Sequence, residues 1–195
     1  MADDGQLEKL LADSQTGQSN RYYGKYRGSV TQLGKDADGV PFCLKAKVHA
    51  VFGDERESGW AKPCVPFAGP GHGFIFLPEV GDTVWIEFEA GRLDAPIWTG
   101  FAWRADQTPP KPGSEKVRLI ATSKGHQIAL DEDADTIEIT HPGGAKITIK
   151  AAEIALTLGA CSLKISTSEI NLNNGMVKVT AAGASLVNDA LKIGG

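Results

Sequence analysis

The last 92 residues of this chain contain no aromatic side chain. All fourteen phenylalanine, tyrosine and tryptophan residues lie between Tyr22 and Trp103, and nine of the ten prolines lie at or before Pro112. Aromatic rings supply much of the bulk of an ordinary core, so the second part of the chain has little material for a thick one. We therefore expect two different bodies, a compact domain followed by a slender structure of small and aliphatic residues.

A surplus of positive charge is also missing. The net charge is −4; up to Trp103 the chain has 10 basic and 14 acidic residues, and after it 10 of each. Phosphate backbones select a strongly basic surface. Neither part is therefore expected to take nucleic acid as its main partner.

Cysteine motifs and long apolar runs are missing as well. The three cysteines, Cys43, Cys64 and Cys161, are an odd number and form no CxxC motif, which favours free thiols in a reducing compartment. No apolar run approaches the ~18 residues that span a bilayer. The acidic start of the chain lacks the apolar segment of a signal peptide. These features predict folding and assembly in the cytoplasm.

Residues 21–103 have the pattern of a small all-β domain. Short apolar alternations, separated by glycine and proline, predict five strands. The strands are expected at Tyr22–Val30, Phe42–Val48, Phe74–Leu77, Thr83–Glu89 and Pro96–Phe101. Five strands of this length suit a Greek-key barrel of the OB type. Before them, residues 1–20 are expected to form a short helix with Leu7, Leu10 and Leu11 on one side, followed by a loop.

A polar, proline-rich linker is predicted at residues 104–115, and a β-rich rod at 116–195. In the rod, apolar residues come in pairs separated by one residue, beginning with Val117 and Leu119, and from Ile147 the pairs recur every seven to nine residues. Alternation places each pair on one face of a strand. The residues expected to form an inward core are Ile147, Ile149, Ile154, Leu156, Leu163, Ile165, Ile170, Leu172, Val177 and Val179.

One chain of this kind leaves its narrow apolar face in water, whereas three chains around an axis bury it. We therefore expect an all-β rod, a trimeric β-prism or β-helix, in which strand edges also pair between chains. Chains intertwined in this way would resist heat and SDS. The alternative is a single-chain β-helix, although about 60 residues would give it only three or four coils.

The most specific signal is a set of ordered strings. They are residues 22–28 (YYGKYRG), 60–74 (WAKPCVPFAGPGHGF), 77–89 (LPEVGDTVWIEFE), 96–100 (PIWTG) and 122–131 (TSKGHQIALD). Within the OB part, the characteristic positions are Tyr23, Gly24, Trp60, Pro63, Pro66, Gly71, Gly73, Pro78, Gly81, Asp82, Trp85, Trp98 and Gly100. Together these strings resemble the baseplate assembly protein V and VgrG-like spike family of contractile phage tails and related injection systems.

The resemblance implies a homotrimeric spike within a virion baseplate or injection particle. Its OB domains would join the tail tube and baseplate hub, and the rod would point toward the target envelope, with membrane contact only during puncture. Some relatives end in a His-x-His iron site; no histidine follows His141 here, so a separate PAAR-type tip protein is expected at the C-terminal end. Others carry a lysozyme domain where this chain has only its proline-rich linker, so that activity is not expected.

Histidines are scattered along the chain. His49, His72, His126 and His141 stand singly, without the HxH, HxxxH or HExxH spacing of a metal site. A metal site within one chain is therefore not expected. Three copies of His126 or His141 could still meet at a trimer axis.

Three further patterns have simple structural explanations. The glycine-rich segment 69–73 lacks the lysine of a P-loop and suits a tight turn. The acidic run 131–135 lacks the EF-hand pattern and suits a solvated turn. Glu87 and Glu89 share one face of a strand but have no evident cleft or partner for acid–base catalysis.

The sequence thus predicts a structural spike protein without enzymatic activity, catalytic residues, cofactor or metal. Two alternatives stay open. One is an OB-type module on a stalk that binds carbohydrate or nucleic acid through its aromatic residues. The other is an envelope-degrading enzyme, which lacks a recognisable catalytic constellation.

Overall fold

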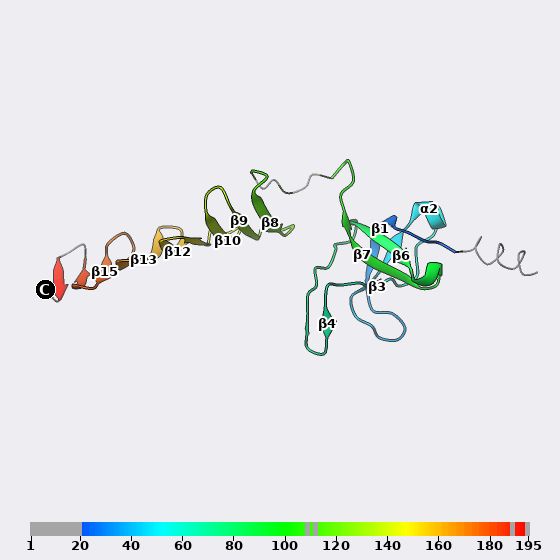
Figure 1. Ribbon diagram of the computed structural model, residues 1–195, viewed down its shortest axis with the longest axis horizontal. Coiled ribbons are helices and arrows are strands. Elements are labelled where there is room, and N and C mark those ends of the chain that lie inside the picture. The colour runs from blue at the N-terminus through cyan, green and yellow to red at the C-terminus, as the bar shows by residue number, and fades with distance from the viewer. Residues whose placement is uncertain (1–20, 108–109, 111–112, 188–189, 194–195) are drawn as a thin grey trace, which may run out of the picture. The chain divides into compact units, whose positions relative to one another are not determined.

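The computed structural model describes residues 21–107, 110, 113–187 and 190–193. The chain divides into two compact units, Met1–Thr108 and Pro109–Gly195, whose elements are labelled in Figure 1. The predicted helix and loop at residues 1–20 lie outside the described residues. Among the described residues, no helix has the length and apolar character needed to cross a membrane.

The first unit contains a five-stranded sheet in the order β2-β1-β6-β7-β3. Its strands are β1 (Tyr26–Gly34), β2 (Cys43–Lys47), β3 (Lys62–Pro63), β6 (Thr83–Phe88) and β7 (Pro96–Ala102). All neighbouring strands are antiparallel except β3, which runs parallel to β7. Leu44 in β2 and Ala61, just before β3, exchange two backbone hydrogen bonds of 3.1 and 2.7 Å. These bonds join the two ends of the sheet and close the expected barrel.

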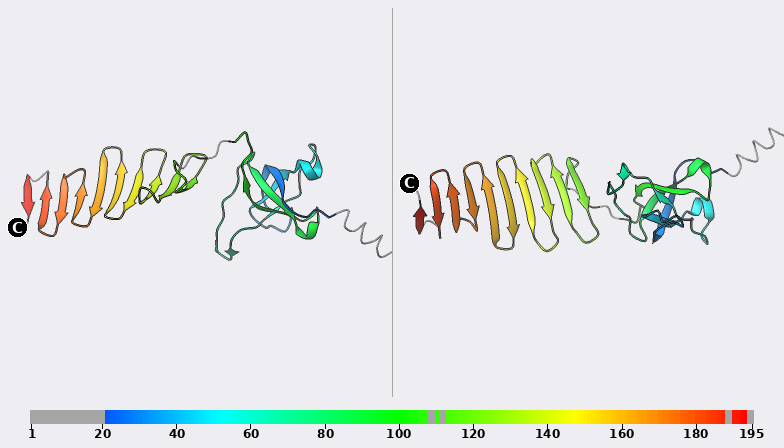
Figure 2. Two further views of the ribbon diagram at one scale, coloured as in Figure 1. Left: turned by 45° about the horizontal axis from the view of Figure 1, so that its top comes forward. Right: turned by 90° about the horizontal axis from the view of Figure 1, so that it is seen from below.

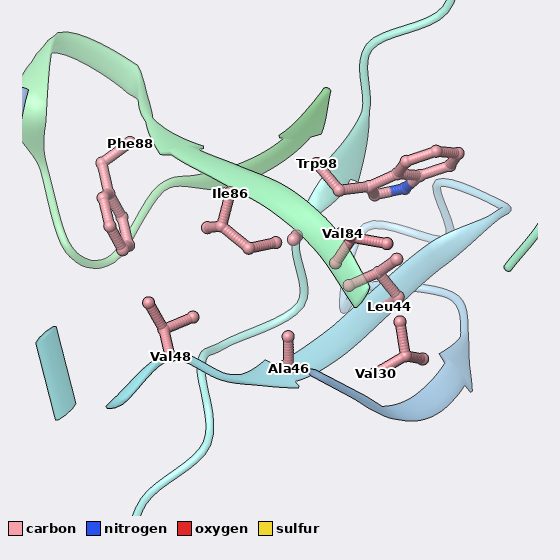
Figure 3. Packing of buried hydrophobic residues seen from close by; sticks show 9 residues of the cluster. Val30, Leu44, Ala46, Val48, Val84, Ile86, Phe88 and Trp98 are labelled. Carbon is pink, nitrogen blue, oxygen red and sulfur yellow. The ribbon is translucent and has the colours of Figure 1, made fainter. Parts of the chain in front are cut away.

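The barrel core is built by alternate residues of its strands, as Figure 3 shows. Leu44, Val84 and Ile86 are fully buried, and Trp98 is 2% exposed. The buried cluster is Val30, Leu44, Ala46, Val48, Ala61, Val84, Ile86, Phe88 and Trp98. Removing these apolar side chains from water is the main term that stabilises such a domain.

Two single turns of helix accompany the barrel. They are α2 (His49–Phe52) and the 3₁₀ helix η1 (Glu89–Gly91). The Phe52 ring packs edge-on against Phe88, with ring centroids 6.1 Å apart. The sequence does not predict these turns, because one turn is too short to show the period of a helix.

One predicted strand is wrong. Residues Phe74–Leu77 pair with no strand, and their side chains are 37–47% exposed. A short apolar run does not reveal whether a partner strand lies beside it. The fifth barrel strand is β3 instead, while the same excursion contains a small hairpin of β4 (Ala68–Gly69) and β5 (His72–Gly73).

The second unit is a single-layer sheet of ten antiparallel strands in chain order, seen as a ladder in Figure 2. Each strand pairs with the next strand along the chain. The strands are β8 (Val117–Ala121), β9 (Gln127–Asp131), β10 (Thr136–Thr140), β11 (Lys146–Lys150), β12 (Glu153–Leu158), β13 (Cys161–Ser166), β14 (Glu169–Leu172), β15 (Val177–Thr180), β16 (Gly183–Leu186) and β17 (Leu191–Ile193).

This meander corrects two expectations about the rod. The strand edges expected to pair between chains are paired within the chain, because every described strand from β9 to β16 has two neighbours in the same sheet. The single-chain β-helix is wrong for the described residues, because the coils of a β-helix stack parallel strands and all pairs here are antiparallel. Hairpins are the local unit of this sheet.

Candidate functional site

The ten-stranded sheet has one apolar side. Ile154 lies opposite Ile149 on one neighbouring strand and opposite Ile165 on the other. Residues directly opposite each other in adjacent strands project to the same side of a sheet. The apolar pairs of successive strands therefore form two columns that run across the strands.

These columns extend from β9 to β17. The first contains Ile128, Ile139, Ile147, Leu156, Leu163, Leu172, Val177, Leu186 and Leu191. The second contains Leu130, Ile137, Ile149, Ile154, Ile165, Ile170, Val179, Ala184 and Ile193. We call these two columns the apolar face. All ten residues that the sequence placed in an inward core lie on this face.

The apolar face is in contact with water in a single chain. Ile154, Ile170 and Leu172 are 41%, 43% and 38% exposed, whereas Ile86 of the barrel is fully buried. Soluble proteins rarely leave a continuous apolar surface of this length uncovered. The geometry therefore indicates an interface rather than an outer surface.

The opposite side of the sheet is polar and internally paired. Glu138 forms an ion pair with Lys146 at 2.5 Å, and Glu169 forms one with Lys178 at 3.2 Å. A hydrogen bond from Asn171 and the Lys178 ammonium together lower the pKa of Glu169 below its usual value. This side suits contact with water.

The first strand of the sheet departs from the expected pairing. Leu119 lies opposite Ala129 on the polar side, whereas Ile120 lies opposite Ile128 and extends the apolar face by one strand. Val117, two residues before Leu119, shares its side. The sequence has apolar residues at adjacent positions here, so alternation alone did not fix which of them faces the apolar columns.

Tryptophan and proline at the OB positions shape the barrel. Trp98 is buried and donates its indole N–H to the Phe42 carbonyl oxygen at 3.0 Å. Arg27 lies 5.3 Å from the centre of the Trp85 ring and Lys45 lies 5.2 Å from that of Trp60, both in cation–π contact. Pro63 pairs with Trp98 across β3 and β7, and Pro78 is buried.

Gly81 and Asp82 form the turn into β6. Gly81 has φ +98°, a left-handed conformation that favours glycine, and donates its N–H to Val30 at 2.9 Å. The Asp82 carboxylate accepts the backbone N–H of Glu79 at 2.8 Å. Gly24 and Gly100 also have positive φ.

The other OB positions do not contribute to the core. Tyr23 is 67% exposed and Pro66 is exposed. Gly71, with φ +74°, and Gly73 belong to the β4–β5 hairpin. The barrel itself therefore does not explain why these residues are present.

The histidines form one pair that the sequence did not reveal. His126 and His141 come together with ring centroids 4.9 Å apart. Each Nδ1 already has a partner, because that of His126 lies 3.1 Å from the Thr122 hydroxyl and that of His141 accepts the Gly143 N–H at 2.9 Å. Within the described ranges, no three His, Cys, Asp or Glu side chains gather in a way that suits a metal.

The acidic run 131–135 and Glu87 have local structural roles. Asp131 accepts the backbone N–H groups of Asp133 and Ala134 at 3.0 and 2.9 Å, which fixes the turn between β9 and β10. Glu87 forms an ion pair with Lys25 at 2.6 Å, and both side chains are more than a third exposed. Neither arrangement is an enclosed site for catalysis.

Two family models match the chain. Residues 26–103 match the Type VI secretion system/phage-baseplate injector OB domain, and residues 116–178 match the phage baseplate V C-terminal trimerisation domain. The chain belongs to the phage baseplate V/VgrG-like spike family. The trimerisation match runs from β8 into β15 and covers most of the apolar face, which supports a homotrimer.

Two relatives from Vibrio cholerae serotype O1 show the extent of the similarity. The actin cross-linking toxin VgrG1 is 37% identical over 107 residues, which are 50% of this chain and 10% of the relative. The Type VI secretion system spike protein VgrG3 is 29% identical over 89 residues, which are 43% of this chain and 9% of the relative. The alignments span about a tenth of the length of these VgrG proteins.

Proposed function

We propose that this chain is the structural subunit of a central spike, which punctures the target envelope as part of a contractile injection machine. The apolar face is the observation that carries the proposal. Three chains around an axis bring three such faces together and leave the paired polar sides in water. The ten inward residues named from the sequence form the core of this trimer.

The size of the apolar face makes the association strong enough for a permanent assembly. Burying the remaining exposed part of one aliphatic side chain is worth ~1 kcal/mol. The two columns together then contribute on the order of 10 kcal/mol per chain, which is comparable with the whole stability of a small domain. An assembly of this kind persists at low protein concentration.

The partners follow from the family. The OB barrel joins the spike to the tail tube and baseplate hub, and the C-terminal end of the rod receives a small PAAR-type tip protein. The role is mechanical rather than enzymatic, and the protein assembles in the cytoplasm before it enters a virion baseplate or injection particle. The exposed positions Tyr23, Pro66, Gly71 and Gly73 serve contacts in that assembly.

Light scattering of the purified chain tests the proposal. We expect a mass of three chains of 20.7 kDa each. A monomer at micromolar concentration would overturn it. An unboiled SDS gel of the same sample measures the resistance of the trimer to detergent. Because the strands pair within each chain, this resistance depends on side-chain packing between chains and not on interlocked strands.

A further inference from the structure

A second uncovered apolar surface lies in the first unit. The segment from Cys64 to Pro78, which we call the uncharged arm, contains no Asp, Glu, Lys or Arg, although 23% of the chain is charged. Figures 1 and 2 show the arm, which includes β4, projecting from the barrel. A projecting segment of this length without a charged residue is unusual for a surface that stays in water.

The arm has a defined shape. It is anchored at its start by a hydrogen bond of 2.9 Å from the Cys64 N–H to the Trp98 carbonyl oxygen. Its two limbs are joined by the β4–β5 pairing and by a 3.1 Å bond from the Phe74 N–H to Phe67. At the tip, the Phe67 and His72 rings stack with centroids 6.4 Å apart. The fold therefore holds this apolar segment in place.

The aromatic rings of the arm are nevertheless uncovered. Phe67, Phe74 and Phe76 are 55%, 46% and 47% exposed. Phe74 and Phe76 pack edge-on against each other, with centroids 5.1 Å apart. Fixed rings that are half in water indicate a contact surface for another molecule.

Two further exposed phenylalanines lie elsewhere in the same unit. Phe42 and Phe101 are 45% and 49% exposed, and Trp98 neighbours the backbone of the first and the ring of the second. The Trp98 indole N–H binds the Phe42 carbonyl oxygen, and the Trp98 and Phe101 rings are 5.9 Å apart. Phe42 has φ +61°, a conformation that bulky residues rarely adopt and that often marks functional sites. We call Phe42 and Phe101 the receiving patch.

We propose that the uncharged arm of one copy packs on the receiving patch of the next copy around the trimer axis. This inference rests on the trimer proposed above. A three-fold interface joins two different surfaces of identical chains. One arm and one patch per chain form a closed ring that leaves neither surface uncovered. A second copy therefore fits the arm better than a hub protein, which would leave the receiving patch exposed.

Disulfide trapping tests this contact in the full chain. The exposed cysteines are first removed as Cys64→Ser and Cys161→Ser, while the buried Cys43 is kept. Phe74→Cys is then combined with Phe101→Cys, and the protein is oxidised and boiled in SDS without reductant. We expect covalent trimers from the pair and monomers from either single variant. Phe74→Cys with Tyr23→Cys is the matched control and is expected to stay monomeric on the gel, because Tyr23 lies outside the patch.

The outcomes separate this inference from the proposed function. A trimer by light scattering without cross-links overturns the arm contact alone, and dimers from Phe74→Cys alone overturn it by showing that arms meet each other. A monomer by light scattering overturns both. Hydrogen exchange of the unaltered trimer is the second measurement: we expect residues 74–77 to exchange at least about tenfold more slowly than a free loop. Protection that appears only after a hub protein is added would also overturn the inference.

Discussion

The barrel and the ten-stranded sheet cover their apolar residues in different ways. The barrel closes on itself through Leu44 and Ala61, so that Ile86 is fully buried within one chain. The sheet remains a single layer, so that Ile154 stays 41% exposed. The first region contains every phenylalanine, tyrosine and tryptophan, and the second contains none. A single layer without bulky residues cannot make its own core, and its stability depends on other chains.

Charge on the apolar face should give the largest effect. Ile154→Asp would place three carboxylates in the centre of the trimer, at a cost of several kcal/mol per chain. We expect light scattering to show monomers in place of trimers. Tryptophan fluorescence should still report a folded barrel, because all four tryptophans lie in the first region.

The matched control carries the same new residue on the other side of the sheet. Lys164 is exposed and lies opposite Ala155 and Asn171 in the polar column. Lys164→Asp should therefore leave the mass at three chains. Loss of the trimer in both variants would contradict the assignment of the two sides.

Truncation of a side chain in the barrel core should destabilise the barrel and leave the trimer intact. Leu44 is fully buried, so Leu44→Ala should lower the free energy of unfolding of the barrel by about 2–5 kcal/mol. Denaturant unfolding followed by tryptophan fluorescence measures this change. The trimer should persist by light scattering. A variant that lost its trimer together with its barrel would show that the two regions are not independent.

Acid should weaken the barrel to a smaller extent. Hydrogen bonds from Thr31 at 2.7 Å and Lys45 at 3.1 Å lower the pKa of Glu57 below its usual range. The stabilisation is therefore present above the ordinary glutamate pKa and is lost as pH falls through the lower folded value. We expect the difference in denaturation midpoint between the native protein and Glu57→Gln to shrink as pH falls below the ordinary glutamate pKa. A difference that is independent of pH would contradict this assignment.

The smallest effect is expected on the polar side of the rod. Lys178→Gln removes the ion pair between Lys178 and Glu169, two side chains that are partly exposed to solvent. Exposed ion pairs contribute little to stability. The trimer mass and the thermal midpoint should both remain unchanged. A clear loss of trimer would show that this side, too, is an interface.

Much of the fold is predictable from the sequence because the signals are local. Strict alternation in segments such as Ile147–Thr148–Ile149 fixes which side each residue takes, and both β6 and β7 lie where the sequence predicts strands. The pattern failed where alternation was ambiguous, as at Leu119 and Ile120. It also failed at Phe74–Leu77, because an apolar run carries no information about whether a partner strand lies beside it.

Features that depend on distant contacts were not predictable. The parallel pairing of β3 with β7 joins residues far apart in the chain. The left-handed conformation of Phe42 depends on its surroundings, including the hydrogen bond from Trp98. Phenylalanine rarely adopts this conformation, so the residue type does not predict it. The pairing of strands within the rod also differed from the expectation, because apolar alternation is the same whether a strand pairs within its chain or with another.

The meander makes the length of the ten-stranded sheet depend directly on its number of hairpins. Each strand adds about 4.8 Å along the direction of the backbone hydrogen bonds. Removal of β12 and β13 together would bring β11 beside β14 and would shorten the sheet by about 10 Å. The two strands would still be antiparallel, and both apolar columns would stay continuous. Removal of one strand would reverse the direction of every strand that follows. Such a sheet can change length only in even steps, and reach can be adjusted without altering the barrel.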